Sequence, residues 1–169
     1  IESQDLPLNV SRETVQRNPA VRRIQKALVG RLIRELESLA KENPDQYDQF
    51  WKEFGPFIKE GVATDFAGRD ALIPLLRFHT SHTVNKADAS MISLAEYIDQ
   101  EQSTIYYLLG EDLESIGHSP HMDYFRANDI PVLYLVDPID SFMIMSLTEY
   151  EEKPIKSIDD PSLDLPTQE

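Results

Sequence analysis

A basic residue and an amide residue stand one helical turn apart near the start of the chain. Arg12 and Gln16 follow Asn9 and Ser11, either of which can cap the beginning of a helix. The first amides of a helix are unpaired donors that attract anions, and Arg12 in that first turn gains little from the helix dipole. Gln16 lies on the same helical face as Arg12. The pattern favours a loop that binds an anionic group such as phosphate; an ordinary ion pair between Arg12 and a nearby carboxylate is the open alternative.

Two acidic residues and two pairs of histidines are the other candidate ligand sets. Asp137 and Asp140 have the chemistry to hold Mg²⁺, but two acids beside a proline are more typical of a turn followed by a helix cap. The histidine pairs are His79 with His82 and His118 with His121. Neither pair is accompanied by cysteines, and a zinc site needs three or four ligands together. We therefore predict no metal site.

The composition excludes several classes of function. The chain has 169 residues, a formal net charge of -14 and no cysteine. An acidic protein repels nucleic acid and anionic membranes, so neither is expected as a partner. The absence of cysteine suits a reducing cytoplasm, and no apolar run approaches the roughly 18 residues of a membrane span. We expect a cytoplasmic protein.

The first half of the chain has the periodicity of helices. Apolar residues recur every three or four positions over residues 21–39, after the cap and first-turn pair Asn18-Pro19. The pair Asn43-Pro44 repeats that start signal before an aromatic stripe over residues 47–57. A third helix is expected around residues 72–76. Together these segments predict a small three-helix bundle.

The second half alternates strands with helices. Near-continuous apolar runs occupy residues 105–109 and 132–136, and a polar stretch of helical length separates them. This pattern is typical of a βαβ unit whose parallel strands are buried on both faces. The box Ser93-x-x-Glu96 predicts a short helix before the unit, and Asp140 is expected to cap another after it. Residues 155–158 are a candidate third strand.

The predicted fold class is therefore α+β or α/β, with a three-helix bundle followed by a small α/β/α sandwich containing a short parallel sheet. The chain is expected to have five parts. These are a connecting segment with the anion-binding loop (1–18), the bundle (19–82), a loop and short capped helix (83–104), the sandwich (105–158) and an acidic linker or tail (159–169).

Five blocks of the sequence resemble the heat-shock protein 90 chaperones, including their bacterial high-temperature protein G members. The blocks are LPLNVSRETVQRN (6–18), FGPFIKEG (54–61), LLRFHTS (75–81), IYYLLGE (105–111) and VLYLVDPID (132–140). They occur in the family's order and at nearly its spacing. The resemblance implies a middle-domain fragment of an ATP-dependent chaperone.

The resemblance also implies roles for the loop residues. In that family an arginine reaches from the middle domain to the γ-phosphate of ATP, and a glutamine four residues later accompanies it; these match Arg12 and Gln16. ATP and Mg are expected to be bound by an N-terminal ATPase domain, which this chain lacks, as it lacks the family's C-terminal dimerisation domain. The fragment alone is thus expected to be monomeric and without ATPase activity, and its parent to be a homodimer.

A candidate surface for unfolded-protein clients lies at residues 142–145. A helix with four successive apolar residues cannot bury all of them against one sheet face, which leaves Phe142 and Met145 for a partner. The family's corresponding helix meets non-native clients, often through an acidic residue and a tryptophan where this chain has Ser141 and Phe142. Incidental exposure is the open alternative. The alternative functions are a non-catalytic protein-interaction module, or a small-ligand α/β domain using Gly110 and Asp137 at the strand ends.

Overall fold

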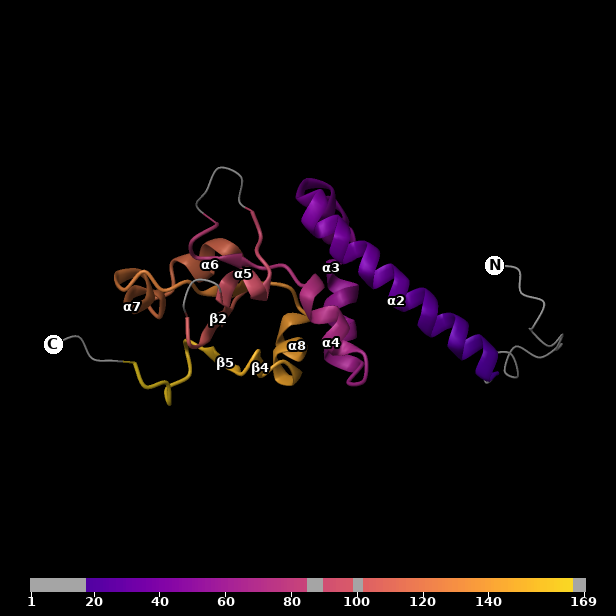
Figure 1. The fold of residues 1–169 in the computed structure, drawn as a ribbon. Helices are drawn as coiled ribbons and strands as arrows, with labels where there is room; N and C mark the ends of the chain where they lie inside the picture. Colours follow the sequence, from indigo (N-terminus) through magenta and orange to yellow (C-terminus); the bar gives the residue numbers. More distant parts are fainter. Residues whose placement is uncertain (1–17, 85–89, 99–101, 166–169) are drawn as a thin grey trace.

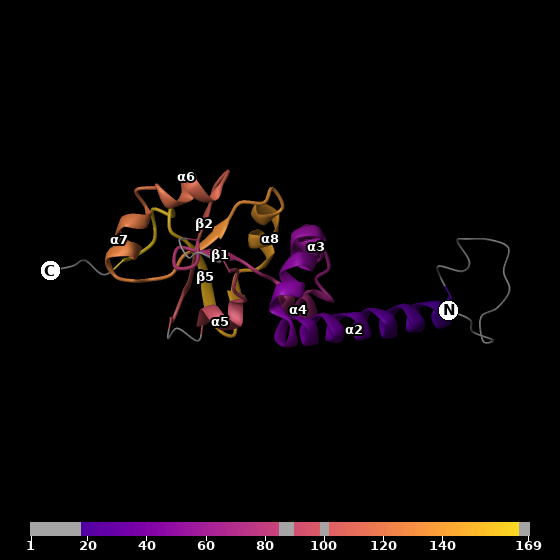
Figure 2. The same ribbon diagram turned by 90° about the horizontal axis from the view of Figure 1, so that it is seen from above.

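The computed structural model describes residues 18–84, 90–98 and 102–165. Two long helices begin the described chain, α2 (Pro19–Glu42) and α3 (Pro44–Thr64). Both begin as predicted, with an asparagine cap followed by proline: the Oδ1 atoms of Asn18 and Asn43 accept the amides of Ala20 and Gln46 at 2.8 Å and 3.2 Å. The first half of α2 extends away from the other elements (Figures 1 and 2).

The predicted third helix is divided into two short pieces. Helix α4 (Arg69–Leu72) is followed directly by a 3₁₀ turn, η1 (Ile73–Leu75). Pro74 explains the change, because it has no backbone N–H with which to continue the α-helical hydrogen bonds. The chain therefore leaves the helical region at Leu76, whose backbone is extended.

The second half forms a five-stranded mixed sheet in the order β1-β3-β2-β5-β4. The strands are β1 (His79–Thr80), β2 (Ile105–Leu109), β3 (Leu133–Leu135), β4 (Glu149–Tyr150) and β5 (Lys153–Ser157). The predicted parallel arrangement is confirmed for the centre, where β2 pairs in parallel with both β3 and β5. Sequence analysis missed the edge strands β1 and β4, which pair antiparallel with β3 and β5. Each has only two residues, too few for a recognisable alternation.

Helices cover both faces of this sheet, as the sandwich prediction requires. The remaining helices are α5 (Leu94–Ile98), α6 (Leu113–Gly117), α7 (Met122–Ala127) and α8 (Asp140–Ser146). Leu133 and Leu135 of β3 point into a cluster shared with α3, α5 and α8, whereas Tyr134 points into a cluster shared with α6 and α7. The Ser93-Glu96 capping box is present before α5, since Glu96 accepts the Ser93 amide at 2.7 Å and Ser93 Oγ accepts the Glu96 amide at 3.2 Å.

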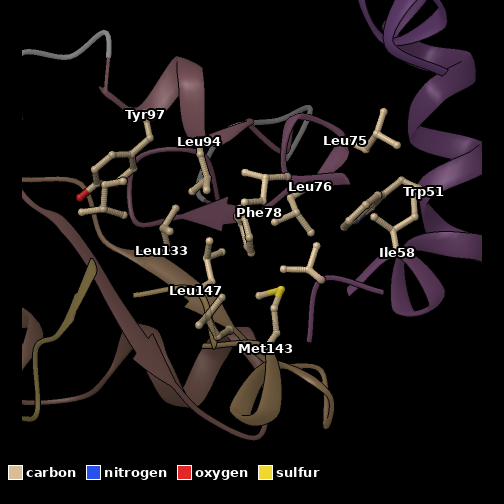
Figure 3. Packing of buried hydrophobic residues seen from close by; sticks show 14 of the residues in the cluster. Trp51, Ile58, Leu75, Leu76, Phe78, Leu94, Tyr97, Leu133, Met143 and Leu147 are labelled. Atoms are coloured by element: carbon tan, nitrogen blue, oxygen red, sulfur yellow. The ribbon is translucent and has the colours of Figure 1, made fainter. Parts of the chain in front are cut away.

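One hydrophobic core continues from the helices into the sheet. Trp51 and Ile58 of α3 belong to the same buried cluster as Leu133 of β3 and Met143 of α8 (Figure 3). Helix α8 lies between α3 and the sheet (Figure 2). The position of α8 is therefore set from two sides.

Candidate functional site

Helix α8 presents the predicted client-contact residues outward. The side chains of Phe142 and Met145 are 65% and 76% exposed, whereas Met143 between them is fully buried. Ser141 is also exposed, and its Oγ donates to the carbonyl of Pro138 at 3.2 Å. The helix thus has a buried side that packs on the core and an apolar side that faces solvent.

A buried ion cluster holds the first turn of α8 against α3. Lys59 of α3 is only 4% exposed, and its Nζ lies 2.5 Å from Asp137 Oδ2 and 2.8 Å from Asp140 Oδ1. Asp140 is completely buried, and its Oδ2 accepts the Asp137 amide at 2.9 Å. Burial raises the pKa of Asp140, while the Lys59 ammonium and the Asp137 amide act against that rise.

The structure corrects the predicted role of Asp140. Ile139 occupies the N-cap position of α8 without a side-chain capping hydrogen bond, and Asp140 is the first residue inside the helix. Its carboxylate closes the preceding turn through the Asp137 amide and neutralises Lys59. Asp137 and Asp140 share the Lys59 ammonium as their charged partner, and Asp137 is in addition 40% exposed to solvent. The buried Asp140 Oδ1 has this ion pair but no hydrogen bond, so the charge of Asp140 depends on Lys59.

Lys59 is the site residue that sequence analysis overlooked. It continues the buried stripe of α3 formed by Gly55, Ile58 and Val62. A lysine at a core-facing helical position is an unusual pattern, because lysine is almost never fully buried unless it is paired. The position of Lys59 on the core-facing side of the predicted helix therefore indicates a buried acidic partner.

The last turn of α8 has a second attachment to the helical part. Arg69 of α4 donates from Nη1 to the carbonyl of Ser146 at 2.7 Å. Ser146 Oγ also lies 3.4 Å from the carbonyl of Val62 in α3. Both ends of this seven-residue helix are therefore fastened to α3 and α4.

A cavity of about 370 Å³ lies beside the ion cluster, between α3 and the β1–β3 edge. Trp51, Lys59, His79, Tyr134 and Asp137 are among its lining residues. The Nδ1 atom of His79 is buried without a hydrogen-bond partner. Burial, followed by the nearby Lys59 charge, lowers the pKa of His79 below 6.5.

The other candidate residues are not gathered into a site. Arg12 and Gln16 lie outside the described residues. His82 Nε2 lies 3.4 Å from Asp129 Oδ1, and His118 Nδ1 lies 2.9 Å from the carbonyl of Glu114. Over the described ranges, no three His, Asp or Glu side chains are grouped so that they could hold a metal ion. Within the same ranges, no helix has the length and apolar character needed to cross a membrane.

Gly110 is occupied with packing at the carboxyl end of β2. Its amide donates to the carbonyl of Leu135 at 3.0 Å, and an added Cβ would lie 2.4 Å from Ile116 Cγ1. The close approach of α6 explains why glycine is needed there. Packing against α6 thus accounts for Gly110, and the ion pair with Lys59 accounts for Asp137, so neither residue needs a small ligand to explain it.

Comparison with known proteins places these features in a family. The Hsp90 protein family model matches residues 1–169. The chain is 43% identical over 166 residues to chaperone protein HtpG of Alkalilimnicola ehrlichii, covering 98% of this chain and 26% of that protein. It is 42% identical over 172 residues to chaperone protein HtpG of Chlorobaculum tepidum, covering 100% of this chain and 27% of that protein.

A solved structure extends the likeness to the fold. The middle domain of a Plasmodium falciparum heat shock protein superimposes with a TM-score of 0.75 at 26% identity, covering 84% of this chain and 58% of that one. The chain belongs to the Hsp90 family. Within that family it corresponds to the middle domain, in agreement with the α+β architecture and the mixed sheet. It spans about a quarter of the length of the two HtpG relatives.

Proposed function

We propose that this Hsp90 middle domain binds unfolded or partly folded client proteins through the exposed side of α8. The observation that carries the proposal is the pair of outward side chains, Phe142 at 65% and Met145 at 76% exposure, on a helix whose Met143 is fully buried. Aromatic and methionine side chains adapt to irregular apolar partners, and an unfolded chain offers such partners.

The polar surroundings of this surface suit transient contact. Ser141 lies beside Phe142 and hydrogen-bonds Pro138, so the apolar area is small and interrupted. A small apolar surface gives weak and reversible association, as the release of clients requires.

A binding assay with a matched control tests this proposal. Phe142→Ala combined with Met145→Ala should weaken affinity for a permanently unfolded, fluorescently labelled protein by about 30-fold, since truncating two contact residues at about 1 kcal/mol each removes about 2 kcal/mol. Phe57→Ala removes the same type of side chain at 67% exposure from α3 and should leave affinity unchanged. Equal losses in the two variants, or no loss in either, would contradict the proposal.

We further propose that Arg12 and Gln16 act on ATP held, with Mg, by the N-terminal domain of the longer protein. A cation near the γ-phosphate stabilises charge that develops during phosphoryl transfer, and Gln16 helps to order the loop around the attacking water. Support comes from the match of the loop sequence to the family and from the family membership of the whole chain. Because Arg12 arrives by domain closure, hydrolysis should be slow and gated by conformation.

We also propose that the longer protein is a homodimer located in the cytoplasm.

Steady-state ATP turnover of the full-length protein tests the arginine assignment. Arg12→Ala should lower turnover by about 100-fold or more while ATP affinity is retained, because the missing charge acts mainly in the transition state. Arg22→Ala on the exposed side of α2 is the matched control and should be neutral. Unchanged turnover in Arg12→Ala would make Arg12 a structural residue.

A further inference from the structure

The sequence of α8 does not by itself determine which side of the helix is buried. Four successive apolar residues, Phe142 to Met145, occupy the centre of a helix of only seven residues. One residue corresponds to about 100° of helix rotation, so a turn by one position would exchange one apolar side chain for another at the core. Among these four residues hydrophobic burial therefore discriminates weakly between rotations of α8, and the main apolar preference comes from Leu147, which is buried one turn after Met143.

The ion cluster does discriminate between them. Asp140 is in the first turn of α8, and its Oδ1 lies 2.8 Å from Nζ of Lys59 in α3. A rotation of α8 by one residue, about 100°, would turn this carboxylate away from Lys59. Lys59 is also bound to Asp137 immediately before the helix, at 2.5 Å. Another rotation would separate the Asp140 carboxylate from Lys59, which would keep only Asp137 as a charged partner. Separating a buried ion pair costs more than exchanging one apolar side chain for another at the core.

We propose that Lys59 is a positioning residue that sets the rotation of α8 and thereby keeps Phe142 and Met145 on the solvent side. The effect of Lys59 on client binding rests on the proposed client contact, whereas its effect on α8 itself does not. A buried ion cluster often adds little to net stability compared with an apolar replacement. Its effect here is to favour one rotation of α8 over the neighbouring rotations.

The decisive variant removes both buried charges together. Lys59→Met with Asp140→Asn leaves neither an unpaired ammonium nor an unpaired buried carboxylate, and Asn at position 140 can still accept the Asp137 amide. The double variant should unfold within a few degrees of wild type, unlike Lys59→Met alone. Asp123→Asn, which removes an exposed charge paired with Arg126 on α7, is the control.

Two spin labels report the orientation of α8. The chain has no cysteine, so Arg34→Cys on α2 and Ser141→Cys on α8 can be labelled selectively in every background. We expect one narrow distance distribution in wild type and in Asp123→Asn, and a broadened or shifted distribution in the folded double variant. A folded double variant with the wild-type distribution would overturn the proposal. It would show that apolar packing is sufficient to orient α8 without the buried charges.

A milder variant decides the question if the double variant does not fold. Asp137→Asn changes a side chain that is 40% exposed and removes one of the two charged partners of Lys59. It should fold and give a smaller broadening of the same distribution. A wild-type distribution in Asp137→Asn would then overturn the proposal.

Client affinity separates this inference from the proposed function. The folded double variant should bind the unfolded probe about fivefold more weakly than wild type, a typical effect of a residue that acts through another. If Phe142→Ala with Met145→Ala weakens binding but the double variant does not, the positioning role fails and the client surface stands. If truncating Phe142 and Met145 has no effect, the client surface fails, and the spin-label distances still decide the role of Lys59.

Discussion

Helices α8 and α2 both expose large apolar side chains, but only α8 also has fully buried residues. Phe142 and Met145 of α8 are 65% and 76% exposed beside a Met143 that is fully buried. Leu28 and Leu32 of α2 are 46% and 58% exposed, and none of its described residues is buried. Exposure alone therefore does not define a contact site. The apolar side chains of α8 are held in place by fully buried residues on its other side, whereas α2 packs on the core only through partly buried residues such as Ile33, Leu36 and Leu39.

Removing the anchor of α8 should have the largest effect on stability. Lys59→Ala leaves buried Asp140 without its ammonium, and breaking a buried ion pair in this way typically costs about 3–5 kcal/mol. Urea unfolding measures the loss. Lys52→Ala, an exposed lysine on the same helix, should change the free energy of unfolding by less than about 0.5 kcal/mol. Similar changes in the two variants would show that Lys59 is not an anchor.

The buried side of α8 should respond more strongly than its exposed side. Met143→Ala creates a cavity in the core and should lower the free energy of unfolding by about 2–4 kcal/mol. Met145→Ala, the same substitution on the exposed side, should cost less than about 0.5 kcal/mol. Thermal or urea unfolding of both variants measures the difference. Equal losses of unfolding free energy in Met143→Ala and Met145→Ala would contradict the distinction between the two sides of α8.

The protonation of His79, which lines the cavity between α3 and the β1–β3 edge, should make the free energy of unfolding sensitive to acid. The folded state lowers the pKa of His79 below 6.5, so the unfolded chain binds more protons as the pH falls through 6.5 toward the folded value. Stability contributed by neutral His79 is thus fully present above pH 6.5 and is lost on acidification in that window. Urea unfolding at several pH values should show a smaller loss in His79→Gln than in wild type. Parallel pH profiles would contradict the assignment.

The exposed ion pair of α2 should have the smallest effect. Arg31 Nε lies 3.9 Å from Glu35 Oε1, with side chains 77% and 69% exposed. Because such pairs are hydrated and screened, Arg31→Ala should change the free energy of unfolding by less than about 0.5 kcal/mol. A loss comparable to that of Lys59→Ala, measured by the same unfolding assay, would remove the distinction between the two helices.

The elements with strong local signals could be predicted from the sequence. The Asn-Pro pairs before α2 and α3 and the Ser93-Glu96 box before α5 each place a cap beside a helix, and the structure has all three. The parallel strands at β2 and β3 were equally clear, because they are continuous apolar runs. The two-residue edge strands and the break at Pro74 depend on tertiary pairing and on local backbone geometry, which periodicity does not report.

The site was only partly predictable for a similar reason. The sequence predicted Phe142 and Met145 as the outward residues of α8, and both are exposed in the structure. The sequence did not reveal that Lys59, 83 positions before Phe142, contacts the first turn of this helix. Asp140 had the residue type of a helix cap, and only the folded arrangement shows that its partner is a buried ammonium. Long-range pairing of charges leaves no periodic pattern along the sequence.

The most direct test of the account is site-specific photocrosslinking to a permanently unfolded protein. A photoreactive phenylalanine analogue would replace Phe142 of α8 in one variant and Leu32 of α2 in another, since both side chains are large, apolar and more than half exposed. We predict strong crosslinking from position 142, little from position 32, and competition by unlabelled unfolded protein at position 142. Equal crosslinking at the two positions, or none at position 142, would contradict the assignment of α8 as the client-binding surface.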